Sequence, residues 1–142
     1  MSVGDPIYTR EILRLAAAIP NQVDFAELAE ESELRSPACG SRLRLAIDRD
    51  EEGCIVSVRQ AVQACAFGQA AAALVASAAV GRTAQSLTEV DELVANWLSG
   101  KEASAPWPGL GLLEPARTRA GRHGAILLPF RALAREARRL QS

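Results

Sequence analysis

The stretch that decides the fold is residues 42–62, RLRLAIDRDEEGCIVSVRQAV. Its first part alternates apolar and polar residues, which predicts a half-buried strand with Leu43, Leu45 and Ile47 on the inner face. Residues 50–53 are Asp-Glu-Glu-Gly, a turn that contains glycine, the residue that hairpin turns favour. Residues 54–62 then supply an antiparallel partner strand. The sequence therefore predicts a β-hairpin here.

The flanking sequence predicts helices on both sides of this hairpin. Apolar spacing indicates a helix over residues 7–19, and imperfect alternation over residues 25–34 indicates an edge strand. Alanine-rich residues 65–80 predict a helix that ends at Gly81, and further helices are expected over residues 87–98 and 129–140. Residues 101–111 predict a loop, and residues 112–123 are ambiguous because Pro115 and Gly121 interrupt them.

These elements predict an α+β fold in one domain over residues 1–142. We expect a small three-stranded antiparallel sheet, with an N-terminal helix and several C-terminal helices packed on one face. The chain is 49% apolar with a net charge of −1, which favours a soluble globular protein and argues against a nucleic-acid or membrane partner. The first residues lack the layout of a signal peptide, so the expected location is cytoplasmic.

Three cysteines, Cys39, Cys54 and Cys65, are then expected as free thiols or metal ligands, because cytoplasmic thiols stay reduced. Cys39 lies in a turn directly before the first hairpin strand, and Cys65 lies between the second strand and the alanine-rich helix. Antiparallel pairing brings these two ends together, so we expect the two thiols side by side. The positive end of a helix dipole favours the thiolate, which is the form that binds soft metals and iron–sulfur clusters.

Each of these residues also allows an ordinary structural interpretation. A free cysteine often serves as a small buried hydrophobe, which is the interpretation we favour for Cys54. His123 follows two arginines, so it is a metal ligand or an ordinary surface histidine. Arginines on one face of the last predicted helix form a solvated face or a docking surface for an acidic partner; they are Arg131, Arg135, Arg138 and Arg139. No phosphate loop, triad or carboxylate pair is evident, so the chain is not expected to be an enzyme.

Several motifs resemble those of the IscU/SufU/NifU N-terminal family. Residues 36–40, Ser-Pro-Ala-Cys-Gly, are similar to the family's Pro-x-Cys-Gly-Asp motif, and residues 64–70 to its Gly-Cys-x-x-Ser-x-Ala segment. Val80-Gly81-Arg82-Thr83 matches its Gly-Lys-Ser/Thr step, and residues 122–133 resemble the stretch around its last cysteine. The resemblance runs from about Tyr8 to Leu140 in the family's element order.

This resemblance implies a scaffold that receives sulfur from a cysteine desulfurase, assembles a [2Fe–2S] cluster from it and iron, and transfers the cluster to acceptor proteins. Zinc binds to the same ligands in the family. Carried over to this chain, the ligands are Cys39 and Cys65, with His123 and Ser41 as further candidates.

Two departures from the family pattern leave alternatives open. Ser41 stands where the family has aspartate, and the third cysteine is replaced by Gly124 or Ala125, depending on a one-residue shift in the alignment. One subunit then offers at most three ligands, whereas a homodimer that pairs Cys39 and Cys65 of both copies would supply four thiolates. The alternatives are a degenerate relative that acts as an interaction module for a desulfurase, and a zinc-binding relative.

Overall fold

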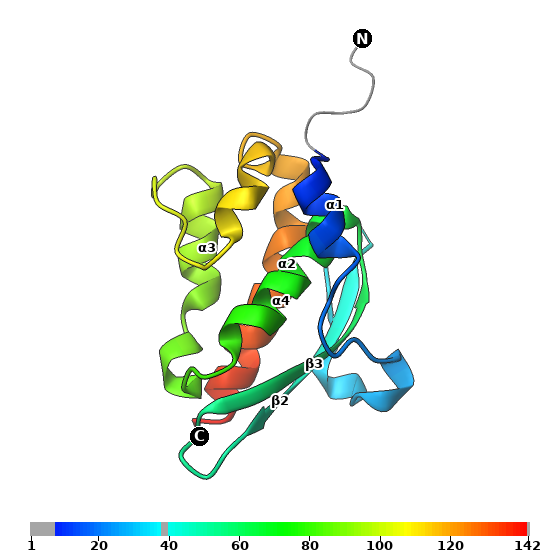
Figure 1. The fold of residues 1–142 in the computed structure, drawn as a ribbon, viewed down its shortest axis with the longest axis vertical. Helices are drawn as coiled ribbons and strands as arrows, with labels where there is room; N and C mark the ends of the chain where they lie inside the picture. Colours follow the sequence, from blue (N-terminus) through cyan, green and yellow to red (C-terminus); the bar gives the residue numbers. More distant parts are fainter. Residues whose placement is uncertain (1–7, 38–39, 142) are drawn as a thin grey trace.

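The computed structural model describes residues 8–37 and 40–141. Strands β1 (Leu34–Arg35), β2 (Arg42–Arg49) and β3 (Ile55–Gln63) form an antiparallel sheet in the order β1-β2-β3. Helices α2 (Ala66–Ala79) and α4 (Ala120–Arg139) pack beside the sheet, and α3 (Val90–Leu98) lies on their far side (Figure 1). The expected α+β fold, with helices packed against a three-stranded sheet, is confirmed.

The hairpin between β2 and β3 forms where the sequence predicts it. The Asp50 Oδ1 accepts hydrogen bonds of 2.9 Å from the backbone N–H groups of Glu52 and Cys54. Gly53 adopts φ 86°, a left-handed conformation that glycine tolerates without steric penalty. Leu43 and Leu45 are buried on the inner face, as the alternation predicts.

The prediction of an edge strand over residues 25–34 is wrong for all but its last residue. The chain forms two short 3₁₀ helices, η1 (Phe25–Glu27) and η2 (Glu30–Ser32), before β1. The Glu27 carboxylate accepts from the Asp24 N–H at 3.0 Å, which closes the first turn. Arg44 of β2 donates to the carbonyl oxygens of Phe25 and Leu28, at 2.8 and 3.1 Å, so these carbonyls bind a side chain instead of a strand.

The last helix is longer than the sequence predicts. It begins at Ala120 and contains Pro129, where the sequence predicts its beginning. Proline cannot donate to the carbonyl four residues earlier, which is that of Ala125. Gly68 of α2 approaches this carbonyl so closely that an added Cβ would lie 3.2 Å from its oxygen. The unused carbonyl of Ala125 therefore faces a neighbouring helix that has no side chain at the contact.

The remaining elements complete the core. Helix α1 (Arg10–Ala16) begins at Thr9, whose hydroxyl accepts from the Ile12 N–H, and it packs against α2. The 3₁₀ helices η3 (Ala84–Leu87) and η4 (Leu110–Ala116) connect the later helices. Helix α2 is buried almost all round, which its alanines permit because they allow close helix packing. Within the described ranges, we find no helix with the length and apolar character that crossing a membrane requires.

Candidate functional site

The candidate site lies at one end of the sheet, where β1, β2 and β3 all begin or end. The register pairs Arg35 with Arg42 and Arg42 with Gln63. The segment between β1 and β2 and the segment that follows β3 therefore leave the sheet at the same end. Antiparallel pairing produces this arrangement, as the sequence predicts.

Residues 36–41 connect β1 to β2, and backbone hydrogen bonds join the described residues of this loop. The Ser36 N–H donates to the Ser41 carbonyl at 2.9 Å, and the Gly40 N–H donates to the Ser36 carbonyl at 3.0 Å. Gly40 has φ 71°, which favours glycine at this position. Cys39, the first expected ligand, falls in this loop but lies, with Ala38, outside the described residues. Ser41 is buried, with 4% of its surface exposed.

Cys65, the second expected ligand, is the N-cap residue of α2. It is half-buried, and its side chain makes no capping hydrogen bond to the helix. Its carbonyl oxygen accepts from the Gln69 N–H at 2.9 Å, which fixes the first helical turn. Cys65 thus sits where the sequence predicts it, directly between β3 and α2.

Cys54 lies at the opposite end of β3. It precedes the first residue of a nine-residue strand, whereas Cys65 follows the last. At about 3.3 Å per residue, the strand separates the two cysteines by roughly 30 Å. Cys54 therefore cannot contribute to a site at the Cys65 end.

The N-terminal part of α4 forms the third wall of the site. A Cβ built on Gly124 would lie 2.8 Å from the Ser36 Oγ. A Cβ built on Gly68, in the first turn of α2, would lie 3.4 Å from the Ala125 Cβ and 2.7 Å from the Ala64 Cβ. Gly124, one of the two alternatives that the resemblance gives for the family's third cysteine, therefore lies against Ser36, and Ala125, the other alternative, lies against Gly68 at the start of α2.

His123 is half-buried beside this wall, but one of its ring nitrogens is already engaged. The Nε2 lies 3.0 Å from the Ala116 carbonyl oxygen and 2.9 Å from that of Arg117, at the end of η4. Since both carbonyls can only accept, Nε2 carries the hydrogen and Nδ1 alone retains a lone pair for a metal. The structure thus gives His123 a structural contact that the sequence did not indicate.

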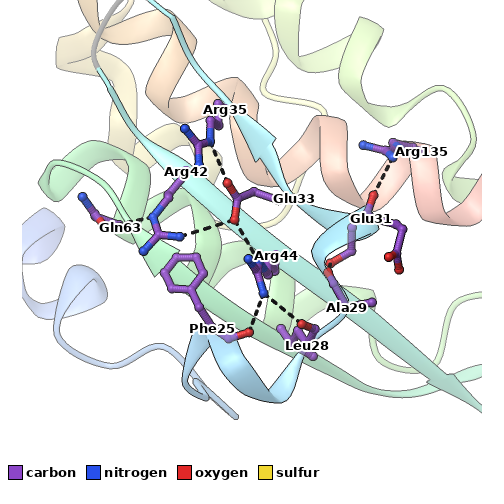
Figure 2. A network of polar contacts seen from close by, with 11 residues as sticks. Phe25, Leu28, Ala29, Glu31, Glu33, Arg35, Arg42, Arg44, Gln63 and Arg135 are labelled. Carbon is purple, nitrogen blue, oxygen red and sulfur yellow. Dashed lines mark hydrogen bonds and ion pairs between the residues drawn. The ribbon is translucent and has the colours of Figure 1, made fainter.

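A basic edge formed by Arg35, Arg42 and Arg44 lies beside the loop. The sequence did not indicate it as part of the site. Glu33 accepts from the Arg35 Nε at 2.6 Å and the Arg44 Nε at 2.9 Å, and the Arg42 guanidinium lies 3.4 Å away (Figure 2). The hydrogen bonds from Arg35 and Arg44 lower the pKa of Glu33 from its ordinary value of 4.5 to about 2. Three guanidinium groups around one carboxylate leave an excess of positive charge, and two of them, Arg35 and Arg42, flank the loop.

Arg42 is held in place by two further contacts. Its Nε donates to the Gln63 Oε1 at 3.0 Å, and its guanidinium lies 3.8 Å from the centroid of the Phe25 ring (Figure 2). The sequence feature that could have indicated this basic edge is the alternation of arginine with leucine at the start of β2. That alternation indicates an outward basic face, but not the glutamate at its centre.

The arginines of α4 are mostly engaged within the fold, away from this site. Arg135 donates to the Glu31 carbonyl at 2.7 Å (Figure 2), Arg138 pairs with Asp91 at 3.0 Å, and Arg139 pairs with Glu136. This pairing favours the structural interpretation of that helix face. Among residues 8–37 and 40–141, no group of three or more histidine, cysteine, aspartate or glutamate side chains is arranged to hold a metal ion.

The family model for the NifU-like N-terminal domain matches residues 7–103. A NifU-like N-terminal protein from Brucella abortus is 28% identical, with 96% of each chain covered and a TM-score of 0.78. A protein from Fervidobacterium islandicum, described as an iron–sulfur cluster assembly scaffold for the SUF system, shares the fold at 23% identity, with 90% of this chain and 94% of that chain covered and a TM-score of 0.73.

A search of curated protein sequences finds no match. The family model nevertheless covers well over half of the chain, and the two solved structures share its fold. The chain belongs to the family of NifU-like N-terminal domains, the IscU/SufU-type scaffolds for iron–sulfur cluster assembly.

Proposed function

We propose that this domain holds iron or a [2Fe–2S] cluster through the thiolates of Cys39 and Cys65 while the cluster is assembled, and then transfers it to an acceptor protein. The observation that carries the proposal is the strand register. Because Arg42 pairs with Gln63, the loop that contains Cys39 and the helix start that contains Cys65 leave the sheet at the same end. Membership of a scaffold family supports the same role.

The chemistry of the surroundings supports an anionic cargo. A cluster with thiolate ligands carries negative charge, and Arg35 and Arg42 flank the loop with positive charge. Cys65 is half-buried and packs against the hydrophobic core, so its surroundings limit contact with water. In this proposal the protein binds and positions the cluster, a cysteine desulfurase supplies sulfur, and no reaction is catalysed on a separate substrate. A cytoplasmic location suits such a role, because the thiols stay reduced there.

Two cysteines in one subunit leave the cluster short of ligands. A homodimer that brings together Cys39 and Cys65 of two copies would complete four thiolates. The absence of a cysteine at Gly124 and Ala125 is also the observation that favours the second candidate function, an interaction module that binds a cysteine desulfurase without carrying a cluster.

Anaerobic reconstitution of the full chain with iron and sulfide tests the proposal. We expect visible charge-transfer absorption that disappears in Cys39→Ala and in Cys65→Ala. Cys54→Ala is the matched control and should keep the absorption, because Cys54 lies at the other end of β3. A colourless wild-type protein that still binds a desulfurase would support the interaction module instead, and a colourless protein that contains zinc would indicate a zinc-binding relative.

A further inference from the structure

The outer edge of β2 is open beyond Leu43. β1 pairs only with Arg42 and Leu43, and no other described strand lies on that side of β2. The chain before β1 does not continue as a strand, because the Ser32 N–H donates to the Ala29 carbonyl at 3.1 Å and forms the 3₁₀ turn of η2. The described sheet therefore ends at β2 for most of the length of this strand.

The pairing register shows which backbone groups this edge presents. On the far side of β3, the Gln60 N–H donates to the Asn21 carbonyl at 3.4 Å, and the Gln60 carbonyl accepts from the Val23 N–H at 2.8 Å. The backbone groups of Gln60 thus point away from β2. Its partner across the strands, Leu45, therefore directs its own N–H and carbonyl away from β3, to the open edge. Alternation along the strand gives Ile47 the same orientation.

These backbone groups have no hydrogen-bond partner within residues 8–37 and 40–141. Leu45 is also only 2% exposed. Buried backbone N–H and carbonyl groups are almost always paired, because an unpaired one costs about as much free energy as a lost hydrogen bond. The open edge of β2 thus has the character of a strand whose neighbour is missing.

A cavity of about 420 Å³ lies against this edge. Its walls come from β2, η2 and the C-terminal half of α4, and they include the small side chains of Ala29, Ser32, Ala46 and Ala132. Arg135 of α4 donates to the Glu31 carbonyl at 2.7 Å and so joins two of these walls (Figure 2). A second hollow, lined by residues 47–51, Gly53 and Leu140, continues along the edge to the hairpin turn. The two hollows together leave room for an extended segment beside β2.

The turn end of this edge is acidic. Glu51 and Glu52 are exposed and make no ion pair with a described residue. Asp50 adds a third carboxylate, whose Oδ1 accepts from two backbone N–H groups of the turn. Arg49 is the basic residue next to them, so negative charge is in excess there. A strand that entered the hollows would be stabilised by basic side chains beside the turn and by small apolar side chains beside the buried part of the edge.

We propose that β2 accepts an extended peptide segment of a partner protein as a fourth strand of the sheet. The segment runs antiparallel to β2, as β1 and β3 do, and its N-terminal end carries basic residues that lie beside the hairpin turn. Main-chain hydrogen bonds to Leu45 and Ile47 supply affinity, and alternate side chains supply specificity. This inference is independent of the proposed function, because the open edge lies along the part of β2 that leads away from the candidate site.

A labelled peptide of sequence Lys-Lys-Thr-Thr-Val-Thr-Val tests the inference by fluorescence anisotropy with the full chain. In the proposed register its valines lie opposite Ile47 and Leu45, and its lysines lie beside Asp50 and Glu51. We expect saturable binding, and binding about 10-fold weaker for Glu-Glu-Thr-Thr-Val-Thr-Val. Glu51→Lys should weaken binding of the lysine peptide about 3- to 10-fold. Glu102→Lys, a charge reversal in the exposed loop after α3, is the matched control and should leave the affinity unchanged.

Methylation of the peptide backbone tests the strand geometry without any change to the protein. An N-methyl group on the first valine removes an N–H that would bond to β2, and should weaken binding about 10-fold or more. The same group on the threonine between the valines replaces an N–H that would face solvent, so this peptide should bind like the unmodified one. Hydrogen exchange gives a second readout: the amides of Leu45 and Ile47 should gain protection when the peptide binds.

Three results would overturn the inference. The first is the absence of binding at about 1 mM lysine peptide. The second is an equal loss of affinity from the two methylated peptides, or equal affinity of the lysine and glutamate peptides. The third is a dimer of the peptide-free chain, seen by sedimentation, in which the Leu45 and Ile47 amides are already protected, because a second copy would then be the strand that covers this edge.

Discussion

Arg42 and Gln63 face each other across β2 and β3, and the Arg42 Nε donates a hydrogen bond of 3.0 Å to the Gln63 Oε1. This pair marks the end of the sheet at which the loop of residues 36–41 and the start of α2 emerge. The backbone register determines which segments lie at this end of the sheet. The contact between Arg42 and Gln63 places the basic edge at the same end.

Arg44 should be the arginine on which the local structure depends most. It joins Glu33 to the carbonyl oxygens of Phe25 and Leu28, and so attaches the 3₁₀ segment to β2. Arg44→Ala should lower the free energy of unfolding by about 2 kcal/mol, because hydrogen bonds to charged groups contribute more than neutral ones. Urea denaturation measures this loss. Arg49→Ala, exposed at the far end of the same strand, is the control and should change stability little.

Glu33 should make stability depend on acid pH. Its folded-state pKa of about 2 lies below its ordinary value of 4.5, so the ionised form is favoured by folding. The stabilisation is therefore complete above about pH 4.5 and is lost as the pH falls toward 2. Glu33→Gln should remove this part of the pH dependence in urea denaturation between pH 2 and 6. The exposed Glu30→Gln should retain it, and equal profiles for the wild type and Glu33→Gln would contradict the assignment.

Gly68 should tolerate no side chain. A Cβ there would lie 2.7 Å from the Ala64 Cβ and 3.2 Å from the Ala125 carbonyl oxygen, so Ala64 would have to shift and the α4 backbone would have to adjust as well. Alanine gains about 1 kcal/mol over glycine in helix propensity, whereas overpacking costs roughly 1–3 kcal/mol. We expect Gly68→Ala to be destabilising on balance, by thermal or urea unfolding. Gly111→Ala, where a Cβ meets nothing within 4 Å, should not be destabilising by overpacking; stabilisation by Gly68→Ala would show that the two helices do not touch as described.

The sequence predicts the hairpin of residues 42–62 well because strand alternation and turn chemistry agree there. It predicts the segment before β1 poorly, since Phe25 and Leu28 adopt their conformation by bonding to Arg44, a residue distant in sequence. It also places the start of α4 too late, because proline commonly marks a helix start, whereas Pro129 lies inside α4. Tertiary contacts decide the first case.

In the candidate site, too, local sequence predicts some features and tertiary contacts decide the others. The position of Cys65 at the start of α2 follows from local sequence, and antiparallel pairing places the segments before β2 and after β3 at the same end of the sheet. The contact between Ser36 and Gly124 joins residues far apart in the chain, so no periodicity reveals it. The engagement of His123 by the carbonyls of η4 likewise depends on how α4 packs.

Disulfide trapping between Cys39 and Cys65 tests the central claim most directly. The experiment uses the metal-free full chain with Cys54→Ala, so that only the two candidate ligands remain, and it maps disulfides by mass spectrometry after mild oxidation. A disulfide requires Cα atoms within roughly 4.4–6.8 Å, a range that ligands of one metal ion can satisfy. We predict an intramolecular Cys39–Cys65 disulfide whose formation is slowed by prior addition of Zn²⁺. Two thiols that stay reduced and react independently with an alkylating agent would contradict the claim.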